Sequence, residues 1–518
     1  MAFLVLCIMY LMKVTKKYFE KFYLKIKQSR FCSLLSTLSS TTHPVFFLSL
    51  FYFFSLFFSS SNRTLLLFTL IYLSLLYKIS KNFQQALFFS FLATLPFAKG
   101  KSLSLLLLPK GLIAKNALFD IDYHFPIYLS DIFLFILLYL YFRKRPKISR
   151  KIKLKRKLSF LFFFIYISLA PALNSLYPYV VILSVIQLLK LSFIYFLPIL
   201  LDDCQKKIKN IPLILAAFTF FQTFWVILQR FKKGPLGLDL EAYLPKAQYG
   251  ITSIENVELL RSTGTFFEPS ILGTFMLMHF FFFLSLLLLK KYSSEGEKKI
   301  YTAAIIAAFV SILFTASRGI YLLILVLVGI FIVFLKKFFY VKLLAFKKES
   351  LKLLLLLFPI LIGLSFLSVR LQSVGTLFSP EGSGTYRIQI SQYAFRLAKN
   401  NPFGVGLNLS PYYFATAFPQ EKYIFDPAHP HNIFFQILAE TGFGGLILFS
   451  LFLYASYQSF LKPKTKLRNF EFFIASLAFL ACAQIYPIFI NHSEILSFFF
   501  LYLGFLNLEN STKENSYD

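Results

Sequence analysis

One string near the C-terminal end of the chain combines an acid–base side chain with small residues. His431 and Asn432 are followed by nine residues and then by a pair of glycines three apart, Gly442 and Gly445. An imidazole changes charge near neutral pH, which makes His431 a candidate general base. The glycines allow a neighbouring helix or a substrate to approach the backbone closely. A boundary histidine next to a helix-packing site would give the same pattern, so both interpretations stay open.

Three further ionisable residues lie in or near apolar runs. His429 precedes the string in Pro-Ala-His-Pro-His, and we expect it to be a loop residue that forms no metal pair with His431. Glu440 falls about two turns into the apolar run that follows, and Lys190 lies near the middle of another. Ionisable groups within a membrane are costly and are functional candidates by default. Glu440 and Lys190 would either pair with each other or line a polar region.

Arginines form a second group of candidates, because a guanidinium offers a planar fork of donors that suits phosphate oxygens. Arg261 precedes Ser-Thr-Gly-Thr-Phe-Phe-Glu-Pro, Arg318 lies in a Ser-Arg-Gly turn, and Arg387 and Arg396 share one predicted helix. These positions suggest a phosphate-bearing ligand. The alternatives are contacts with lipid headgroups or salt bridges to the loop acids Glu255, Glu258 and Glu268.

The composition of the whole chain indicates which kind of secondary structure carries these candidate residues. The chain has 518 residues, of which 57% are hydrophobic and only 15% charged, and its mean hydropathy is +0.68. Soluble domains carry roughly a quarter charged residues, which excludes that class. Apolar runs recur along the chain without the alternation of a membrane barrel. The predicted fold class is therefore all-α, a polytopic bundle of membrane helices.

Charge placement predicts the topology of this bundle. Residues 143–157 carry ten basic and no acidic residues between two apolar runs, and such loops stay in the cytoplasm. The net charge of +31 is thus assigned to membrane topology and not to nucleic acid. Both termini are expected inside. The fourteen predicted spans are 44–59, 64–78, 84–98, 128–142, 158–174, 178–201, 211–229, 269–289, 300–316, 319–335, 351–368, 431–461, 470–490 and 493–508.

These spans divide the chain into a cytoplasmic or interfacial segment 1–43, a transmembrane catalytic bundle 44–508 and a cytoplasmic tail 509–518. The bundle carries three long outer loops, 99–127, 230–268 and 369–430. In the last of them, Tyr386, Ile390, Tyr393 and Leu397 recur at helical spacing, which predicts an amphipathic helix at the outer surface. The four cysteines, Cys7, Cys32, Cys204 and Cys482, have no metal-type spacing.

Together these strings resemble the O-antigen ligase and polymerase superfamily of polytopic glycan transferases, in order over residues 255–450. The family pattern of His, then Asn, Ser or Gln, nine residues and Gly-x-x-Gly is matched by His431, Asn432, Gly442 and Gly445. Also similar are Arg261 before Gly264-Thr-Phe and Pro269, the turn Ser317–Gly319, and Arg387 before the Asn-Pro-Phe-Gly-x-Gly segment 401–406. Two departures, Leu446 after the last glycine and Glu268-Pro269-Ser270, leave ligase against polymerase open.

The resemblance implies a lipid-sugar glycosyltransferase fold (GT-C-like) in the bacterial inner membrane, with its active site facing the periplasm. The implied donor is a glycan on polyprenyl pyrophosphate, and the acceptor is a sugar hydroxyl of lipid A-core or of another carrier-linked glycan. His431 would be the base, and Arg261 and Arg318 would hold the pyrophosphate. Substrate contacts are expected from Arg387, Asn432, Glu440, Gly442 and Gly445.

No cofactor and no metal site are expected, since arginines can neutralise the leaving group. The expected partners are the donor, the acceptor and membrane lipids, with no nucleic acid. A flippase or transporter for charged lipids is the alternative from another class. It would need polar sites reachable from both faces, whereas the candidates here gather at the outer boundary, with Lys190 as the main exception.

Overall fold

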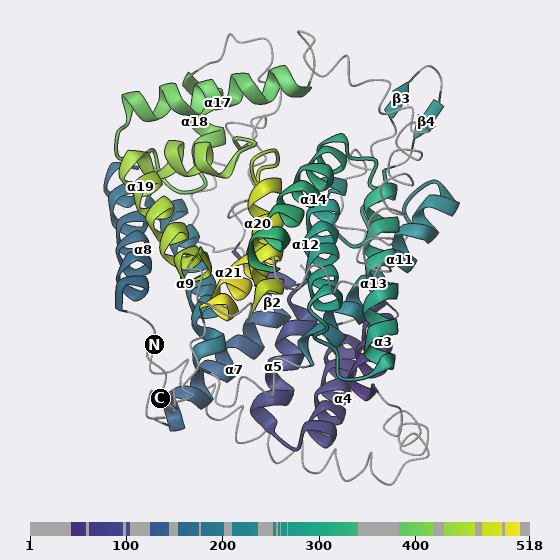
Figure 1. The fold of residues 1–518 in the computed structure, drawn as a ribbon. Coiled ribbons are helices and arrows are strands. Elements are labelled where there is room, and N and C mark those ends of the chain that lie inside the picture. Colours follow the sequence, from purple (N-terminus) through teal and green to yellow (C-terminus); the bar gives the residue numbers. More distant parts are fainter. Residues whose placement is uncertain are drawn as a thin grey trace.

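The computed structural model describes residues 43–57, 62–96, 100–103, 125–144, 154–175, 178–200, 210–236, 252–254, 257–259, 261–266, 268–339, 383–417, 429–461, 469–488 and 493–507. Over these residues the protein is a helical bundle, as predicted, with two short antiparallel hairpins in addition (Figure 1). The helices are α3 (Pro44–Phe57), α4 (Asn62–Ser80), α5 (Phe83–Thr94), α7 (Leu129–Lys144), α8 (Leu154–Asn174), α9 (Pro178–Leu200), α11 (Ile211–Lys232), α12 (Pro269–Leu288), α13 (Glu295–Phe314), α14 (Arg318–Phe339), α17 (Ser383–Asn400), α18 (Ser410–Ala417), α19 (Ile433–Leu461), α20 (Phe470–Cys482) and α21 (Ser493–Leu506).

The hairpins lie in two of the predicted outer loops. Strand β1 (Gly100–Leu103) pairs with β2 (Phe125–Tyr128), and β3 (Thr252–Ile254) pairs with β4 (Val257–Leu259). Gly100 lies opposite Tyr128, and Thr252 lies opposite Leu259. They are the only departure from an all-helical fold in the part of the chain that the structure describes.

The predicted membrane spans coincide with helices, except for 351–368, which lies outside the described residues. Within the described ranges, four stretches are long and apolar enough to cross a membrane: Val180–Pro198, Ile211–Lys232, Pro269–Leu288 and Ile433–Gln458. The protein is therefore an integral membrane protein. The full count of fourteen crossings stays a prediction.

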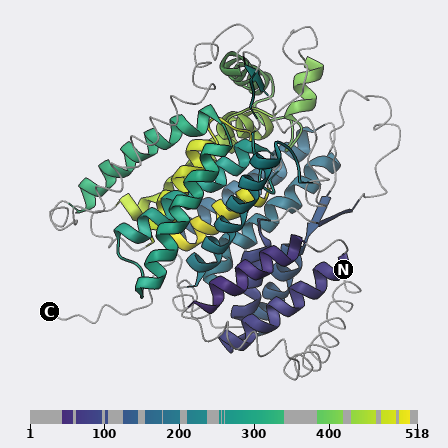
Figure 2. The same ribbon diagram turned by 90° about the vertical axis from the view of Figure 1, so that its right-hand side faces the viewer.

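Helix α12 forms the centre of the bundle. Glu268 precedes it and Pro269 opens it, a position at which the fixed φ of proline suits the helix and its missing N–H is not needed. Almost every side chain of α12 is buried. On one side Phe282 stacks on Tyr502 of α21, and Figure 2 shows the yellow helices α20 and α21 running alongside the teal ones through the middle of the bundle.

Helix α17 is the predicted amphipathic helix. It runs crosswise to the upright helices at one end of the bundle, the end that also carries β3 and β4 (Figure 1). Ile390, Tyr393 and Leu397 are buried on its inner face, and Tyr386 is half-buried. The helical spacing read from the sequence is thus confirmed. The buried face fixes how α17 is turned, and so where Arg387 lies.

Two helix boundaries differ from prediction, and both matter for the site. Helix α20 ends at Cys482 and not near residue 490, because the next residues leave the helix and pair with the start of α19. Helix α19 is broken at Gly442, whose φ of 72° and ψ of −171° are not helical. Glycine adopts such a conformation without a steric penalty.

Candidate active site

Asn432 directly precedes helix α19, and both polar atoms of its side chain form hydrogen bonds there. Its Oδ1 accepts the N–H groups of Phe434 at 2.9 Å and Phe435 at 3.3 Å, as a helix-capping asparagine does. Its Nδ2 donates to Oε1 of Gln484 at 3.0 Å. The sequence assigned Asn432 to substrate contact. In the structure its side chain joins the start of α19 to the segment that follows α20.

This join extends over three consecutive residues on each side. The N–H of Ile433 donates to the carbonyl oxygen of Ala483 at 2.7 Å, Asn432 bonds Gln484, and His431 forms a hydrogen bond with the backbone of Ile485. The two bonded segments are therefore antiparallel. His431 is thereby held next to the residue that follows Ile485.

That residue is Tyr486, which the sequence analysis did not single out. Its hydroxyl lies 2.6 Å from Oγ of Ser317, in the Ser-Arg-Gly turn that precedes Arg318. Gly319 is needed in this turn because a Cβ there would collide with the Tyr486 hydroxyl. The guanidinium of Arg387 lies over the Tyr486 ring, 5.6 Å from its centre. The only sequence signal for this segment was that two residues with polar groups, Gln484 and Tyr486, come shortly before Pro487.

Arg261 joins the same group from another direction. Its Nε donates to the carbonyl oxygen of Thr315 at 3.3 Å, and the N–H of Ser262 donates to that of Phe314 at 3.0 Å. These bonds tie Arg261 to the end of α13, just before the turn that carries Arg318. Burial lowers the pKa of Arg261, and the charge of Arg318 adds to this, while Tyr486 and Glu268 oppose it. An arginine stays protonated under such shifts.

The three arginines therefore meet at Tyr486, although they come from widely separated parts of the sequence. Arg318 interacts electrostatically with Arg387 and with Tyr486, and Arg261 interacts with Arg318 and Tyr486. Like charges in partly buried positions repel each other, so their grouping favours an anionic ligand. The predicted trio of Arg261, Arg318 and Arg387 is brought together by the fold. Arg396 is exposed and instead lies over the Tyr393 ring.

His431 lies beside this cationic group. Burial and then the charge of Arg387 lower its pKa to about 4 from the usual value near 6.5, while the hydrogen bond with Ile485 opposes the shift. The imidazole is thus neutral at pH 7 and has a lone pair available. In the described part of the chain, its buried Nδ1 has no hydrogen-bond partner, and neither has the buried Nε of Arg387. Two unpaired polar atoms beside three cations form a place that can take up an anion and a hydroxyl group.

The glycines of the two motif strings pack against each other. The N–H of Phe443 donates to the carbonyl oxygen of Pro402 at 3.1 Å, and the N–H of Gly406 donates to that of Glu440 at 3.0 Å. A Cβ on Gly442 would collide with the Pro402 backbone, and one on Gly404 would collide with the Glu440 backbone. The close approach predicted for Gly442 is thus made by the chain itself.

Gly445 also serves close packing. A Cβ there would collide with the side chain of Thr441 and lie near Tyr166 of α8. Gly442 and Gly445 therefore allow the 401–406 segment and α8 to pack closely against the broken helix α19.

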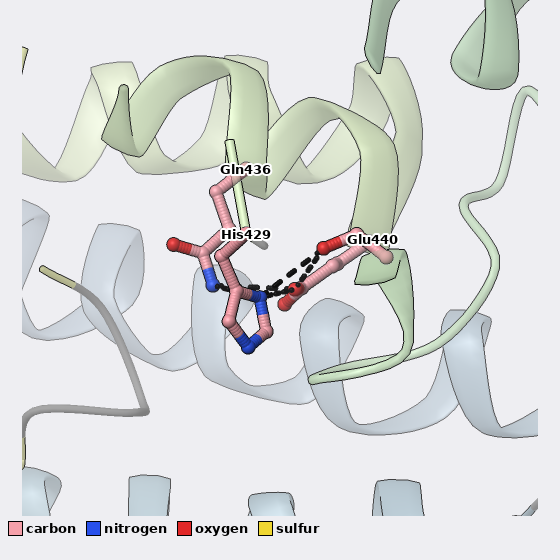
Figure 3. Close-up of polar contacts among 4 residues, drawn as sticks. His429, Gln436 and Glu440 are labelled. Carbon is pink, nitrogen blue, oxygen red and sulfur yellow. Dashed lines mark hydrogen bonds and ion pairs between the residues drawn. The ribbon is translucent and has the colours of Figure 1, made fainter. Parts of the chain in front are cut away.

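Glu440 and His429 lie in one buried polar cluster (Figure 3). Oε1 of Glu440 lies 3.2 Å from Nδ1 of His429, accepts from Oγ of Ser410 at 2.8 Å and accepts from Nε2 of Gln436 at 3.2 Å. The carboxylate is fully buried and the His429 side chain is 13% exposed. His429 lies outside the helices, as expected, but its role as a partner of Glu440 was missed.

Lys190 has a different partner from the one considered. Its Nζ lies 3.0 Å from Oδ1 of Asp131 at the start of α7 and 4.8 Å from the centre of the Tyr128 ring. The pairing of Lys190 with Glu440 is therefore wrong. Among the described residues, no group of three or more His, Cys, Asp or Glu side chains could hold a metal ion.

Comparison with known families identifies a match over the part of the chain that holds three of the candidate site residues. Residues 303–450 match the family model described as O-Antigen ligase, a segment that includes Arg318, Arg387 and His431 and leaves Arg261 and Tyr486 outside. No curated protein matches the chain. Proteins of the matched family are membrane enzymes of the glycosyltransferase type. Through this segment, the chain is similar to the O-antigen ligase family.

Proposed function

We propose that the protein is an O-antigen ligase-like transferase, which moves a glycan from polyprenyl pyrophosphate to a sugar hydroxyl of lipid A-core. The observation that carries this proposal is the meeting of Arg261, Arg318 and Arg387 at Tyr486, with His431 held next to them. The reaction is proposed at the outer face of the bacterial inner membrane, in a bundle of the GT-C-like type with fourteen crossings.

Each group has a task in this reaction. The arginines would bind the pyrophosphate and neutralise the charge that develops on it as the bond to the sugar breaks. His431 would accept the proton of the acceptor hydroxyl at its unpaired Nδ1. Pyrophosphate is a good leaving group, so that no metal ion is invoked. Because His431 is neutral at pH 7, it can act as a base without prior deprotonation.

Binding of the donor would also strengthen this base. The charge of Arg387 is one of the causes that lower the pKa of His431, and a pyrophosphate beside Arg387 would offset that charge. The imidazole would then hold a proton more firmly once the donor is bound. Proton uptake by His431 and binding of the donor are thereby coupled through Arg387.

The test is a coupling assay with purified protein, a polyprenyl-pyrophosphate glycan and lipid A-core, with a chelator present. We expect one coupled product on lipid A-core. His431→Ala should lower turnover by about a hundredfold to ten-thousandfold. Arg261→Lys and Arg318→Lys keep the charge but lose the two-pronged donor geometry, so turnover should fall substantially while membrane insertion is retained.

Three results would contradict the proposal. They are wild-type turnover in the His431→Ala protein, wild-type turnover in both arginine variants, and a requirement for a divalent metal. The polymerase alternative, favoured by Glu268-Pro269-Ser270, would give a ladder of products on the polyprenyl carrier when donor alone is supplied. No coupling with either acceptor would favour the transporter.

A further inference from the structure

Helix α11 carries two glutamines on the face that it turns toward the segment after Arg261. Gln222 and Gln229 are seven residues apart, which places them on one side of the helix, two turns from each other. Both side chains are completely buried, in a stretch that is long and apolar enough to cross a membrane. A buried amide in such a helix is costly unless its polar atoms are paired. The partners of these two side chains therefore indicate what they do.

Gln229 binds the backbone of the turn that follows Arg261. Its Oε1 accepts the N–H groups of Thr263 at 3.1 Å and Gly264 at 2.9 Å, and its Nε2 donates to the carbonyl oxygen of Gly264 at 2.9 Å. The two backbone N–H groups determine which end of the amide is the oxygen. One side chain thus supplies three partners to a buried turn whose backbone groups need them.

Gln222 holds the next residue of the same turn. Its Oε1 accepts the N–H of Thr265 at 3.0 Å, and its Nε2 donates to Oγ1 of that residue. Gly264 has a φ of 60°, and a Cβ on it would collide with Oε1 of Gln222. The glycine therefore allows the turn to pack directly against the two amides.

Arg261 is consequently held between two helices. On one side, its Nε and the N–H of Ser262 bond to the end of α13. On the other side, α11 binds residues 263–265 through its glutamines, and Oγ of Ser262 donates to the carbonyl oxygen of Val226 at 3.3 Å. A guanidinium binds phosphate through donors with a fixed direction, and a misplacement of about 1 Å can cost about a hundredfold in rate.

We propose that Gln229 and Gln222 are positioning residues of the transfer reaction, which act through Arg261 and set the direction of its guanidinium toward the pyrophosphate of the donor. This inference rests on the proposed function, because it takes Arg261 as a ligand of pyrophosphate. Gln229 has the larger part, since it makes three of the five bonds to the turn. Loss of these bonds should impair use of the donor and leave binding of the acceptor unchanged.

Variants of Gln229 test this role in the coupling assay. Gln229→Leu approximates the size of the side chain and removes its three hydrogen bonds. We expect kcat/KM for the donor to fall by about tenfold or more, while the KM for lipid A-core changes less than about twofold. A general loosening of the bundle would raise both KM values.

A matched pair at Gln222 adds a test by conservative replacement. Gln222→Leu removes both bonds to Thr265 and should lower kcat/KM for the donor by about fivefold or more. Gln222→Glu should stay within about threefold of the wild type. The reason is that a carboxyl group in either protonation state can accept the N–H of Thr265 and bond its hydroxyl, which both donates and accepts.

A double-mutant cycle with Arg261→Lys separates positioning from a purely structural role. If Gln229 acts through Arg261, adding Gln229→Leu to Arg261→Lys should lower kcat/KM by less than about twofold, because the fork of donors that it aligns is already absent. Two independent effects would multiply instead.

The control is Thr223→Val on the same helix. The Thr223 hydroxyl is buried as well, but it bonds to α13, with Oγ of Ser311 at 2.8 Å and the carbonyl oxygen of Ala307 at 2.9 Å. Its kcat/KM for the donor, per folded protein, should stay within about twofold of the wild type. Thermal unfolding in detergent reports the folded fraction of every variant.

Binding can also be measured without turnover. Polyprenyl pyrophosphate carries the group that Arg261 is proposed to bind. Titration calorimetry in detergent should give an affinity for the Gln229→Leu protein that is weaker by about fivefold or more than for the wild type, and an unchanged affinity for the Thr223→Val protein.

The inference is overturned if Gln229→Leu keeps at least half of the wild-type kcat/KM, if its effect multiplies with that of Arg261→Lys, if the loss lies in the KM for lipid A-core, or if Gln222→Glu is as impaired as Gln222→Leu. Should Gln229→Leu fail to fold, the pair at Gln222 decides. Failure of the proposed function looks different, because the wild-type protein would then couple neither acceptor and would not bind polyprenyl pyrophosphate.

Discussion

Asn432, the residue before α19, donates a hydrogen bond to Gln484 at 3.0 Å, and this bond links the start of α19 to the segment that follows α20. The same residue caps α19 through Oδ1. His431 directly precedes Asn432, and Tyr486 lies two residues after Gln484. The bond therefore sets the distance between the candidate base and the residue at which the arginines meet.

Substitutions on the two sides of this bond separate a positioning role from substrate contact. Asn432→Ser keeps a capping oxygen but cannot reach Gln484, and Gln484→Ala removes the same bond from the other side. We expect both to lower kcat several-fold with a loss of roughly 1 kcal/mol in stability, measured by coupling kinetics and thermal unfolding in detergent. If Asn432 instead binds substrate, Gln484→Ala will be near wild type and Asn432→Ser severely impaired.

The pH dependence follows from the lowered pKa of His431. Because the group is a base with a pKa of about 4, it is neutral above that pH, and kcat/KM, which reports the free enzyme, should hold between pH 8 and about 5.5 and fall only as pH approaches 4. Arg387→Gln removes one cause of the shift, so the fall should begin at higher pH. An unshifted wild-type profile, centred near about 6.5, would contradict the environment described for His431.

The broken helix α19 predicts different costs for two glycines. Gly442→Ala places a Cβ against the Pro402 backbone at a φ of 72°, so the 401–406 segment must shift, and we expect a loss of about 1–3 kcal/mol in stability together with most activity. Gly329→Ala in α14 meets nothing within 4 Å and should be neutral or slightly stabilising. Thermal unfolding of both proteins in the same detergent decides the matter, and equal stability would contradict the close packing.

The ion pair between Lys190 and Asp131 predicts a non-additive pattern of stability. Lys190→Met leaves a largely buried carboxylate without its partner, which typically costs about 3–5 kcal/mol. The double variant Lys190→Met with Asp131→Asn removes both charges and should recover much of the loss. Additive losses in the double-mutant cycle would show that the two side chains do not interact. Coupling activity should follow stability, since the pair lies outside the candidate site.

The helices and most of the candidate site residues could be predicted from the sequence. Apolar runs must fold as helices in a membrane because lipid cannot satisfy backbone polar groups. The positions of the helices therefore follow from where the apolar runs lie in the sequence. The face of α17 followed from the spacing of Tyr386, Ile390, Tyr393 and Leu397. His431 and the arginines carry chemistry that is visible in the residue type itself.

Contacts between distant segments were decided only by the tertiary structure. Nothing local in the sequence marks Tyr486 as the meeting point of Arg261, Arg318 and Arg387, because each contact joins residues far apart in the chain. The early end of α20 is of the same kind: the residues after Cys482 are apolar enough to continue the helix, but they bond instead to residues 431–433. The partners of His429 and Lys190 could not be predicted from the sequence, because a buried polar or charged group is satisfied by whichever group packing brings near it, and spacing along the sequence does not encode that.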